Sequence, residues 1–247
     1  MRVQLFVTCL VDQLRPSVGV ATVEVLERCG CTVEFDERQT CCGQPAYNSG
    51  HREQAREVIG RTVTLLAEWL ESGGEAIVCP SGSCSSMLSH APDLLADDPV
   101  LHEKAVLVAG KTWELTQFIV DVLGIDDVAS RWKGRVTWHD ACHGLRELKI
   151  RDQPRKLLEQ VRDLDVVECS SCERCCGFGG TFSVSYPDIS GAMAGEKIAE
   201  IDATGVDAVV SCDVSCLMQL EGRLKAAGSA VKPLHVAQIL AEQDPES

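Results

Sequence analysis

The sequence predicts an α/β protein built from two tandem, pseudo-symmetric units, each a small, mainly parallel sheet flanked by helices. Two observations predict this fold: short β-branched runs alternate with helical patterns, and the cysteines of one half recur at matching intervals in the other. A chain of 247 residues is long enough for two units of roughly 120 residues. We expect a first cysteine-rich domain at residues 1–128 and a second at residues 129–247, because the repeats meet between residues 125 and 133.

Strand-like segments precede the cysteines of each half, and helical patterns separate them. The strand-like segments are residues 4–8, 31–40 and 75–78 in the first half and residues 135–141, 165–168 and 207–211 in the second. The clearest helical patterns cover residues 54–70, 115–123, 192–203 and 217–226. This alternation is typical of parallel strands joined by crossover helices, whose ligands bind at the carboxyl ends of the strands. The repeated cysteines of each half are therefore expected at one edge of its sheet.

The cysteines give the measure of the repeat. Corresponding positions lie 132 to 134 residues apart, and two unrelated sets would not stay in step in this way. Residues 111–119 also resemble residues 232–240, so the duplication extends beyond the cysteines. The matched pairs are Cys9 with Cys142, Cys41 with Cys175, Cys42 with Cys176, Cys79 with Cys212 and Cys84 with Cys216.

Four of these cysteines in each half suit an iron–sulfur cluster, which needs about four thiolates that commonly come from separate loops. The Cys-Cys-Gly step offers two adjacent thiols and a glycine that lets the backbone turn closely around a core. Loops that lead into helix N-termini also favour thiolate over thiol. We expect two clusters of the [4Fe-4S] type, with the candidate ligands Cys9, Cys41, Cys42 and Cys84 in one half and Cys142, Cys175, Cys176 and Cys216 in the other.

Zinc is the alternative metal in one half or both, because four thiolates also form a closed structural zinc site. Structural zinc sites usually contain compact C-x2-C pairs, which the repeated positions lack. Cys79 and Cys212 are either fifth ligands or buried thiols at strand ends.

Four further cysteines have no matched partner, and their roles stay open. The spacing of Cys169, Cys172 and Cys175 is that of a ferredoxin run, but no C-x3-C-P sequence follows. The first half has Phe35 and Arg38 at the positions that correspond to the first two of these cysteines, so the repeat argues against the ferredoxin interpretation. The four cysteines are Cys169 and Cys172, together with Cys29 and Cys31, which resemble core positions at a strand edge.

Composition narrows the classes of function. The apolar start of the chain is interrupted by Gln4 and followed by Asp12, and no run approaches 18 apolar residues, so we expect neither a secretory signal nor a transmembrane helix. Fourteen cysteines in a reducing cytoplasm indicate metal or redox chemistry rather than a disulfide scaffold. The net charge of −14 disfavours nucleic acid and anionic membranes as direct partners and leaves protein partners open.

Two histidines flank Cys142. His139 and His143 could supply protons near neutral pH, although a surface or capping role is the simpler interpretation, because nothing in the sequence fixes their orientation. The glycine-rich residues 177–180 do not have the spacing of a dinucleotide-binding loop. The sequence therefore contains no motif for an organic cofactor, and substrate oxidation is expected to need a partner.

With these residues identified, the chain resembles the CCG or cysteine-rich-domain family, whose members contain two copies of a C-xn-CCG-xn-C-x-x-C pattern. The resemblance covers almost the whole chain and is strongest to the small stand-alone members of the lactate-utilisation protein A type. Related modules occur in heterodisulfide reductase and in the iron–sulfur subunit of glycolate oxidase. The motifs that carry the resemblance are FVTCLVD, CCGQPAYNSG, PSGSC, CCGFGGTFSV and DVSCL.

The resemblance implies an iron–sulfur electron-transfer subunit of a complex that oxidises L-lactate to pyruvate together with other subunits, with Cys41, Cys42, Cys175 and Cys176 as cluster ligands. One departure favours four-cysteine sites: Ser81 and Asp213 replace the first cysteine of the final C-x-x-C. Two alternative functions remain open. One is a catalytic cluster protein like heterodisulfide reductase, and the other is a zinc-binding scaffold.

Overall fold

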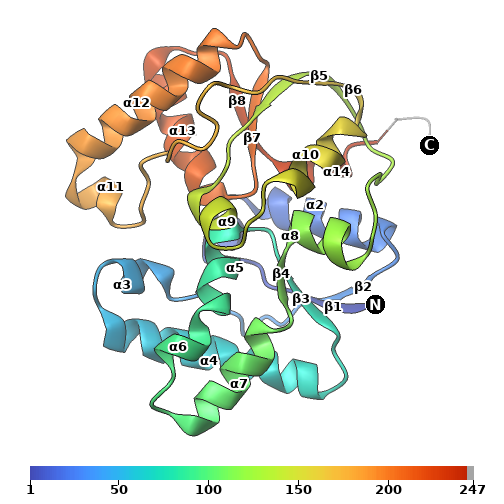
Figure 1. Cartoon of the computed structure of the whole chain (residues 1–247), viewed down its shortest axis with the longest axis vertical. Coiled ribbons are helices and arrows are strands. Elements are labelled where there is room, and N and C mark those ends of the chain that lie inside the picture. The colour runs from blue at the N-terminus through green and yellow to red at the C-terminus, as the bar shows by residue number, and fades with distance from the viewer. Residues whose placement is uncertain (244–247) are drawn as a thin grey trace.

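The computed structural model describes residues 1–243 and contains two four-stranded parallel sheets, one in each half (Figure 1). The predicted fold class, two tandem α/β units with parallel sheets, is confirmed. The first sheet has the order β2-β1-β3-β4, with β1 (Arg2–Leu5), β2 (Thr32–Glu34), β3 (Ala76–Cys79) and β4 (Thr112–Glu114). The second repeats it as β6-β5-β7-β8, with β5 (Arg131–Trp138), β6 (Arg162–Val166), β7 (Ala208–Ser211) and β8 (Lys232–His235).

Helices connect the strands of each sheet and cover its faces. In the first half these are α1 (Cys9–Leu14), α2 (Pro16–Arg28), α3 (Gln44–Asn48), α4 (Arg52–Glu71), α5 (Gly82–Ser89), α6 (Ala91–Leu94), α7 (Pro99–Ala109), α8 (Leu115–Gln117) and the π-helical turn η1 (Phe118–Val122). In the second half they are α9 (Cys142–Arg146), α10 (Asp152–Glu159), α11 (Phe182–Ser185), α12 (Pro187–Ala203), α13 (Val214–Ala227) and α14 (Val236–Ala241). Among residues 1–243, no helix is both long and apolar enough to cross a membrane.

The last helical segment of each half packs against the other half. Helix α14 lies against α2, and α8 with η1 lies against α10, as Figure 1 shows for α14 and α2 near the middle of the molecule. Apolar residues of both halves consequently belong to one continuous core, which includes Leu26, Phe118, Leu158 and Leu240. Burial of these apolar side chains stabilises both halves together. The two halves share a core although each has its own sheet.

Polar contacts hold the halves together near the candidate metal sites. Helices α5 and α9 lie next to each other at the boundary between the halves (Figure 1), and a side chain at Gly82 would approach the Cα of Gly144 to 3.1 Å. Asp213, buried at the start of α13, accepts hydrogen bonds from the Ser83 N–H at 2.9 Å and the Ser81 hydroxyl at 3.2 Å. The same carboxylate caps α13 through Ser215. One residue therefore caps its own helix and ties it to the helix of the other half.

Candidate metal centres

The four candidate ligands of the first half lie together at the carboxyl edge of the sheet. The Sγ atoms of Cys9 and Cys41 are 3.8 Å apart, and those of Cys42 and Cys84 are 3.2 Å apart. A hydrogen bond between the thiols of Cys41 and Cys42 links the two pairs. Cys9 is the first residue of α1 and Cys84 is in the first turn of α5, so two helix N-termini face the group. Their partial positive charge favours thiolates at this edge.

The second half repeats this arrangement with the four corresponding residues. The Sγ atoms of Cys176 and Cys216 are 3.1 Å apart, and Cys175 interacts with the thiols of Cys142 and Cys176. Cys142 begins α9 and Cys216 lies in the first turn of α13, again at helix N-termini. The structure therefore brings together four of the matched cysteines in each half.

The backbone conformation explains why a glycine follows each cysteine pair. Gly43 and Gly177 have φ values of 85° and 84°, which residues with a side chain rarely adopt. A Cβ at Gly177 would lie 2.8 Å from the carbonyl oxygen of Ser190, and one at Gly43 would lie 3.1 Å from that of Ala55. Each glycine N–H donates to the sulfur two residues earlier, over 3.4 Å in both halves. The turn thus directs a backbone donor at a candidate ligand, as is common around metal-bound sulfur.

The electrostatics concentrate negative charge on the first cysteine of each pair. Hydrogen bonds from Cys42 and Cys9 lower the pKa of Cys41 to about 2. In the second half, hydrogen bonds from Cys142 and Cys176 lower the pKa of Cys175 to about 2. The pKa values of the surrounding thiols are raised, because they donate to that sulfur and are desolvated. Four thiols so close together cannot all ionise unless positive charge compensates them, and a metal or an iron–sulfur core provides that charge.

The donor set and the space around it fit an iron–sulfur cluster. A cavity of about 210 Å³ is lined by all four candidate ligands of the first half and also by Phe178, Val184 and Val214 of the second half. Four thiols around a predominantly apolar cavity provide both the ligands and the shielding that a core larger than a single ion requires. A bound cluster would supply one-electron oxidation and reduction at this edge of the sheet.

Cys79 and Cys212 are completely enclosed but differ from the four-thiol groups. The Cys79 thiol donates to the carbonyl oxygen of Ser81 over 3.7 Å. The Cys212 sulfur is packed between Gly82 and Gly144, and the Gly82 N–H donates to it. Both cysteines therefore have contacts at strand ends and at the boundary between the halves, while their role as fifth ligands stays a prediction.

The four unmatched cysteines lie away from the Sγ contacts described above. Cys31 is buried in the shared core between α2 and β2, and Cys29 packs against it. Cys169 is buried and receives the ammonium group of Lys197 at 3.7 Å, while the Arg155 guanidinium lies 3.8 Å from the Cys172 sulfur. The last two thus have cationic neighbours.

His139 does not have the surface or capping role that the sequence favoured. Its side chain is completely buried, and neither ring nitrogen has a hydrogen-bond partner within the described part of the chain. One ring nitrogen lies within 4.8 Å of the Sγ atoms of Cys176 and Cys216. Desolvation lowers the pKa of His139 to about 4, so the ring is neutral at neutral pH. The repeat offers a signal for this burial, because the first-half residue 133 positions earlier is Phe6, a core residue.

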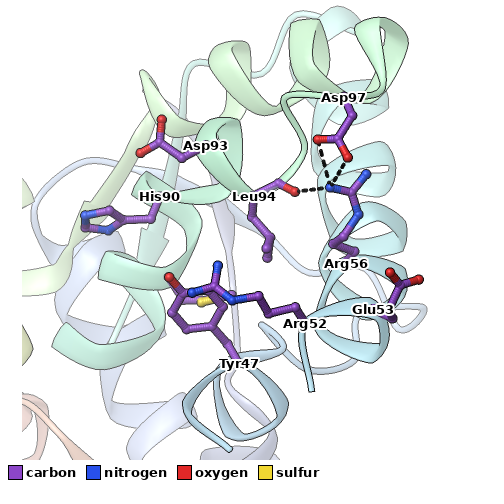
Figure 2. Close-up of a pocket in the computed structure, with 9 residues that line it drawn as sticks. Tyr47, Arg52, Glu53, Arg56, His90, Asp93, Leu94 and Asp97 are labelled. Carbon is purple, nitrogen blue, oxygen red and sulfur yellow. Dashed lines mark hydrogen bonds and ion pairs between the residues drawn. The ribbon is translucent and has the colours of Figure 1, made fainter. Parts of the chain in front are cut away.

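A separate hollow of about 390 Å³ lies on the first half, away from the thiols (Figure 2). Arg56 pairs there with Asp97 and donates to the carbonyl oxygen of Leu94, and the Arg52 guanidinium lies over the Tyr47 ring at 5.1 Å. Its lining mixes acidic and basic side chains and contains no cysteine. This hollow therefore contributes no residue to the two cysteine groups.

Comparisons with known proteins agree with the repeat. The model of the cysteine-rich domain family named CCG matches residues 3–89 and 136–221. Lactate utilization protein A of Bacillus cytotoxicus is 47% identical over 240 residues, covering 97% of this chain and 98% of that protein. Lactate utilization protein A of Geobacillus kaustophilus is 45% identical over the same share of both chains.

Among solved structures, a hypothetical protein from Helicobacter pylori superposes with a TM-score of 0.64 and 11% sequence identity. The match covers 97% of this chain and 48% of that chain, and at this identity it indicates a shared fold only. The family model covers both halves, and the relatives match nearly end to end. The chain belongs to the cysteine-rich CCG domain family and, within it, to the lactate utilization protein A family.

Proposed function

We propose that the chain is a cytoplasmic iron–sulfur electron-transfer subunit of a complex that oxidises L-lactate to pyruvate. The observation that carries the proposal is the gathering of four thiols in each half at the carboxyl edge of its sheet. The relatives' name supports the link to lactate utilisation. The first site is held by Cys9, Cys41, Cys42 and Cys84, and the second by Cys142, Cys175, Cys176 and Cys216.

The residues of this chain have three tasks in such a subunit. The cysteines bind two clusters of the [4Fe-4S] type, and the N–H groups of Gly43 and Gly177 stabilise charge on the sulfurs they contact. The apolar side chains around the first site exclude water. Substrate oxidation itself is assigned to other subunits of the complex.

Metal and sulfide analysis of anaerobically purified protein tests this function. Two four-iron clusters predict roughly eight irons and eight acid-labile sulfides per chain, with EPR signals on reduction. The cluster-loaded chain alone is expected not to oxidise lactate. Zinc without sulfide would overturn the redox function and favour the zinc-binding scaffold. Lactate turnover by the isolated chain would overturn the assignment of substrate oxidation to other subunits.

One observation favours a second candidate function, a catalytic cluster like that of heterodisulfide reductase. The cavity at the first site is large enough to extend from the thiols to apolar residues of the other half, so a small molecule could approach that site. Reduction of a low-molecular-weight disulfide by the loaded, isolated chain would favour this candidate. We expect no such turnover from an electron-transfer subunit.

A further inference from the structure

A buried histidine ring lies beside the thiols of the second site, and the first site has no counterpart to it. This residue is His139, and we propose that it binds the metal of the second-half centre directly through a ring nitrogen. The inference rests on the proposed function, because it names a further ligand of a cluster assigned there. It also makes the two centres chemically different.

The first argument is the burial of the ring. An imidazole has two nitrogens, and a neutral ring ordinarily uses one as donor and the other as acceptor. Both nitrogens of His139 are enclosed without a partner among residues 1–243, and His139 has no exposed surface. Leaving a buried polar group unpaired costs about 1–3 kcal/mol. A metal at the adjacent thiols gives one of these nitrogens a partner.

The second argument is position. A ring nitrogen of His139 and the sulfurs of Cys176 and Cys216 all lie within 4.8 Å of one another. These atoms come from the end of β5, the cysteine pair and α13, so three separate segments of the chain converge on one point. Neutral imidazole and thiolate are ligands that zinc and iron centres accept together.

The third argument is that the main chain of His139 is fixed beside the thiols. The His139 N–H donates to the carbonyl oxygen of Val210 at 2.8 Å, and the His139 carbonyl accepts from the Ser211 hydroxyl at 2.9 Å. Both partners belong to β7, the neighbouring strand. The main chain at His139 is consequently held against β7, and its side chain is enclosed at this position.

Other candidates for an extra ligand have competing contacts. The Cys212 sulfur is packed against Gly82 and Gly144 at the boundary between the halves and does not belong to the group formed by His139, Cys176 and Cys216. The Nδ1 atom of His143 lies 3.6 Å from the Cys142 sulfur, but this side chain is 28% exposed and also lies 4.0 Å from a carboxylate oxygen of Glu147. The first half has Phe6 at the position of His139, and its ring carries no donor. The extra ligand is therefore expected in the second centre alone.

Pulsed EPR of reduced, cluster-loaded protein with ¹⁵N-labelled histidine tests the inference. We expect a nitrogen coupling from one histidine in the unmodified chain, its loss in His139→Phe, which copies the first half, and its retention in His143→Gln. The midpoint potential of one centre should shift in His139→Phe while that of the other is unchanged, because the ligands and hydrogen bonds of an iron–sulfur centre set its potential.

A coupling that persists in His139→Phe, or loaded protein without any histidine coupling, would overturn the inference and leave the proposed function intact. Absence of iron and sulfide from the unmodified chain would instead reject both. Because His139→Phe could fail to load the second site, His139→Cys provides a second variant. It should restore full iron content without the nitrogen coupling, and failure to load with a thiolate at this position would count against a ligand role.

Discussion

The two halves have the same sheet order and the same four thiols, but the surroundings of the two sites differ in charge. Around the first site the core is apolar and includes Phe6, and the buried carboxylate of Asp213 also lines the cavity there. Around the second site lie His139 and three charged side chains: Asp140 is 3% exposed, Lys197 is fully buried, and the side chain of Arg155 is 18% exposed. Reduction potentials of iron–sulfur centres depend on net charge, hydrogen bonds and burial. The duplication therefore kept the scaffold and varied the electrostatic environment.

Corresponding helices show the same contrast. In the first half, the Thr62 hydroxyl of α4 donates to the carbonyl oxygen of Cys41. On α12, the helix that corresponds to α4, the Lys197 ammonium donates to the carbonyl oxygen of Ser171 at 2.6 Å and contacts the sulfur of Cys169 at 3.7 Å. A neutral donor at the first cysteine pair thus contrasts with a buried cation that contacts the segment just before the second pair. Buried cations are rare in proteins unless they have such partners.

The largest effect is expected when one site is removed at a time, which tests whether the two sites are independent. Cys42→Ser and Cys176→Ser are matched variants of the two halves, and each should lose about half of the roughly eight irons and sulfides while the other cluster stays loaded, because each half supplies its own ligands. Iron content and EPR of the reduced protein measure this. Simultaneous loss of both clusters in either variant would show that the halves share one site.

The next largest effect is expected at the charged contacts of the second half. Arg155 donates to both carboxylate oxygens of Asp140, at 3.0 and 2.9 Å. Its replacement in Arg155→Met should lower the free energy of unfolding by about 3–5 kcal/mol, since it leaves the enclosed carboxylate of Asp140 without its cation. Denaturant titration measures the change. The exposed pair of Arg61 with Glu57 is the control, and Arg61→Met should cost less than about 0.5 kcal/mol.

A smaller effect is expected at the residues that cap the last helical segment of each half, because one of these two residues is a buried carboxylic acid. Glu114 caps α8, and His235 caps α14 at the matching place. Burial raises the pKa of Glu114 to about 7, so the folded state binds a proton that the unfolded state releases near 4.5. The stability that this proton contributes is complete below pH 4.5 and is lost as the pH rises to about 7, a difference of about 3 kcal/mol.

Glu114→Gln keeps the capping oxygen and cannot ionise. Its free energy of unfolding, relative to the unmodified chain, should therefore improve by about 2–3 kcal/mol between pH 5 and pH 8. Denaturation midpoints at several pH values measure this. Glu57→Gln, at an exposed site on α4, separates the effect of burial from the loss of one charge. A parallel pH dependence of both variants would contradict this assignment.

The fold and the grouping of the thiols follow from periodicity and the repeat, because strand ends of a parallel sheet meet at one edge. The environment of the second site was not predictable in the same way. Polar residues such as His139 and Lys197 ordinarily indicate surface positions, and only the alignment with Phe6 reveals burial of the first. The sequence also did not predict that the last helical segment of each half packs against the other half, because an apolar helix face does not specify which sheet it covers.

The packing of each last helical segment against the other half affects whether the halves can be separated and suggests how the duplication arose. Residues 115–122 cover α10, and α14 covers α2, so a cut in the link between residues 124 and 130 would strip an apolar face from both fragments. A single copy of the unit would expose the same apolar face, and two copies could cover these faces by exchanging their last helical segments. The present chain has the geometry of a domain-swapped pair whose two subunits have been joined into a single polypeptide.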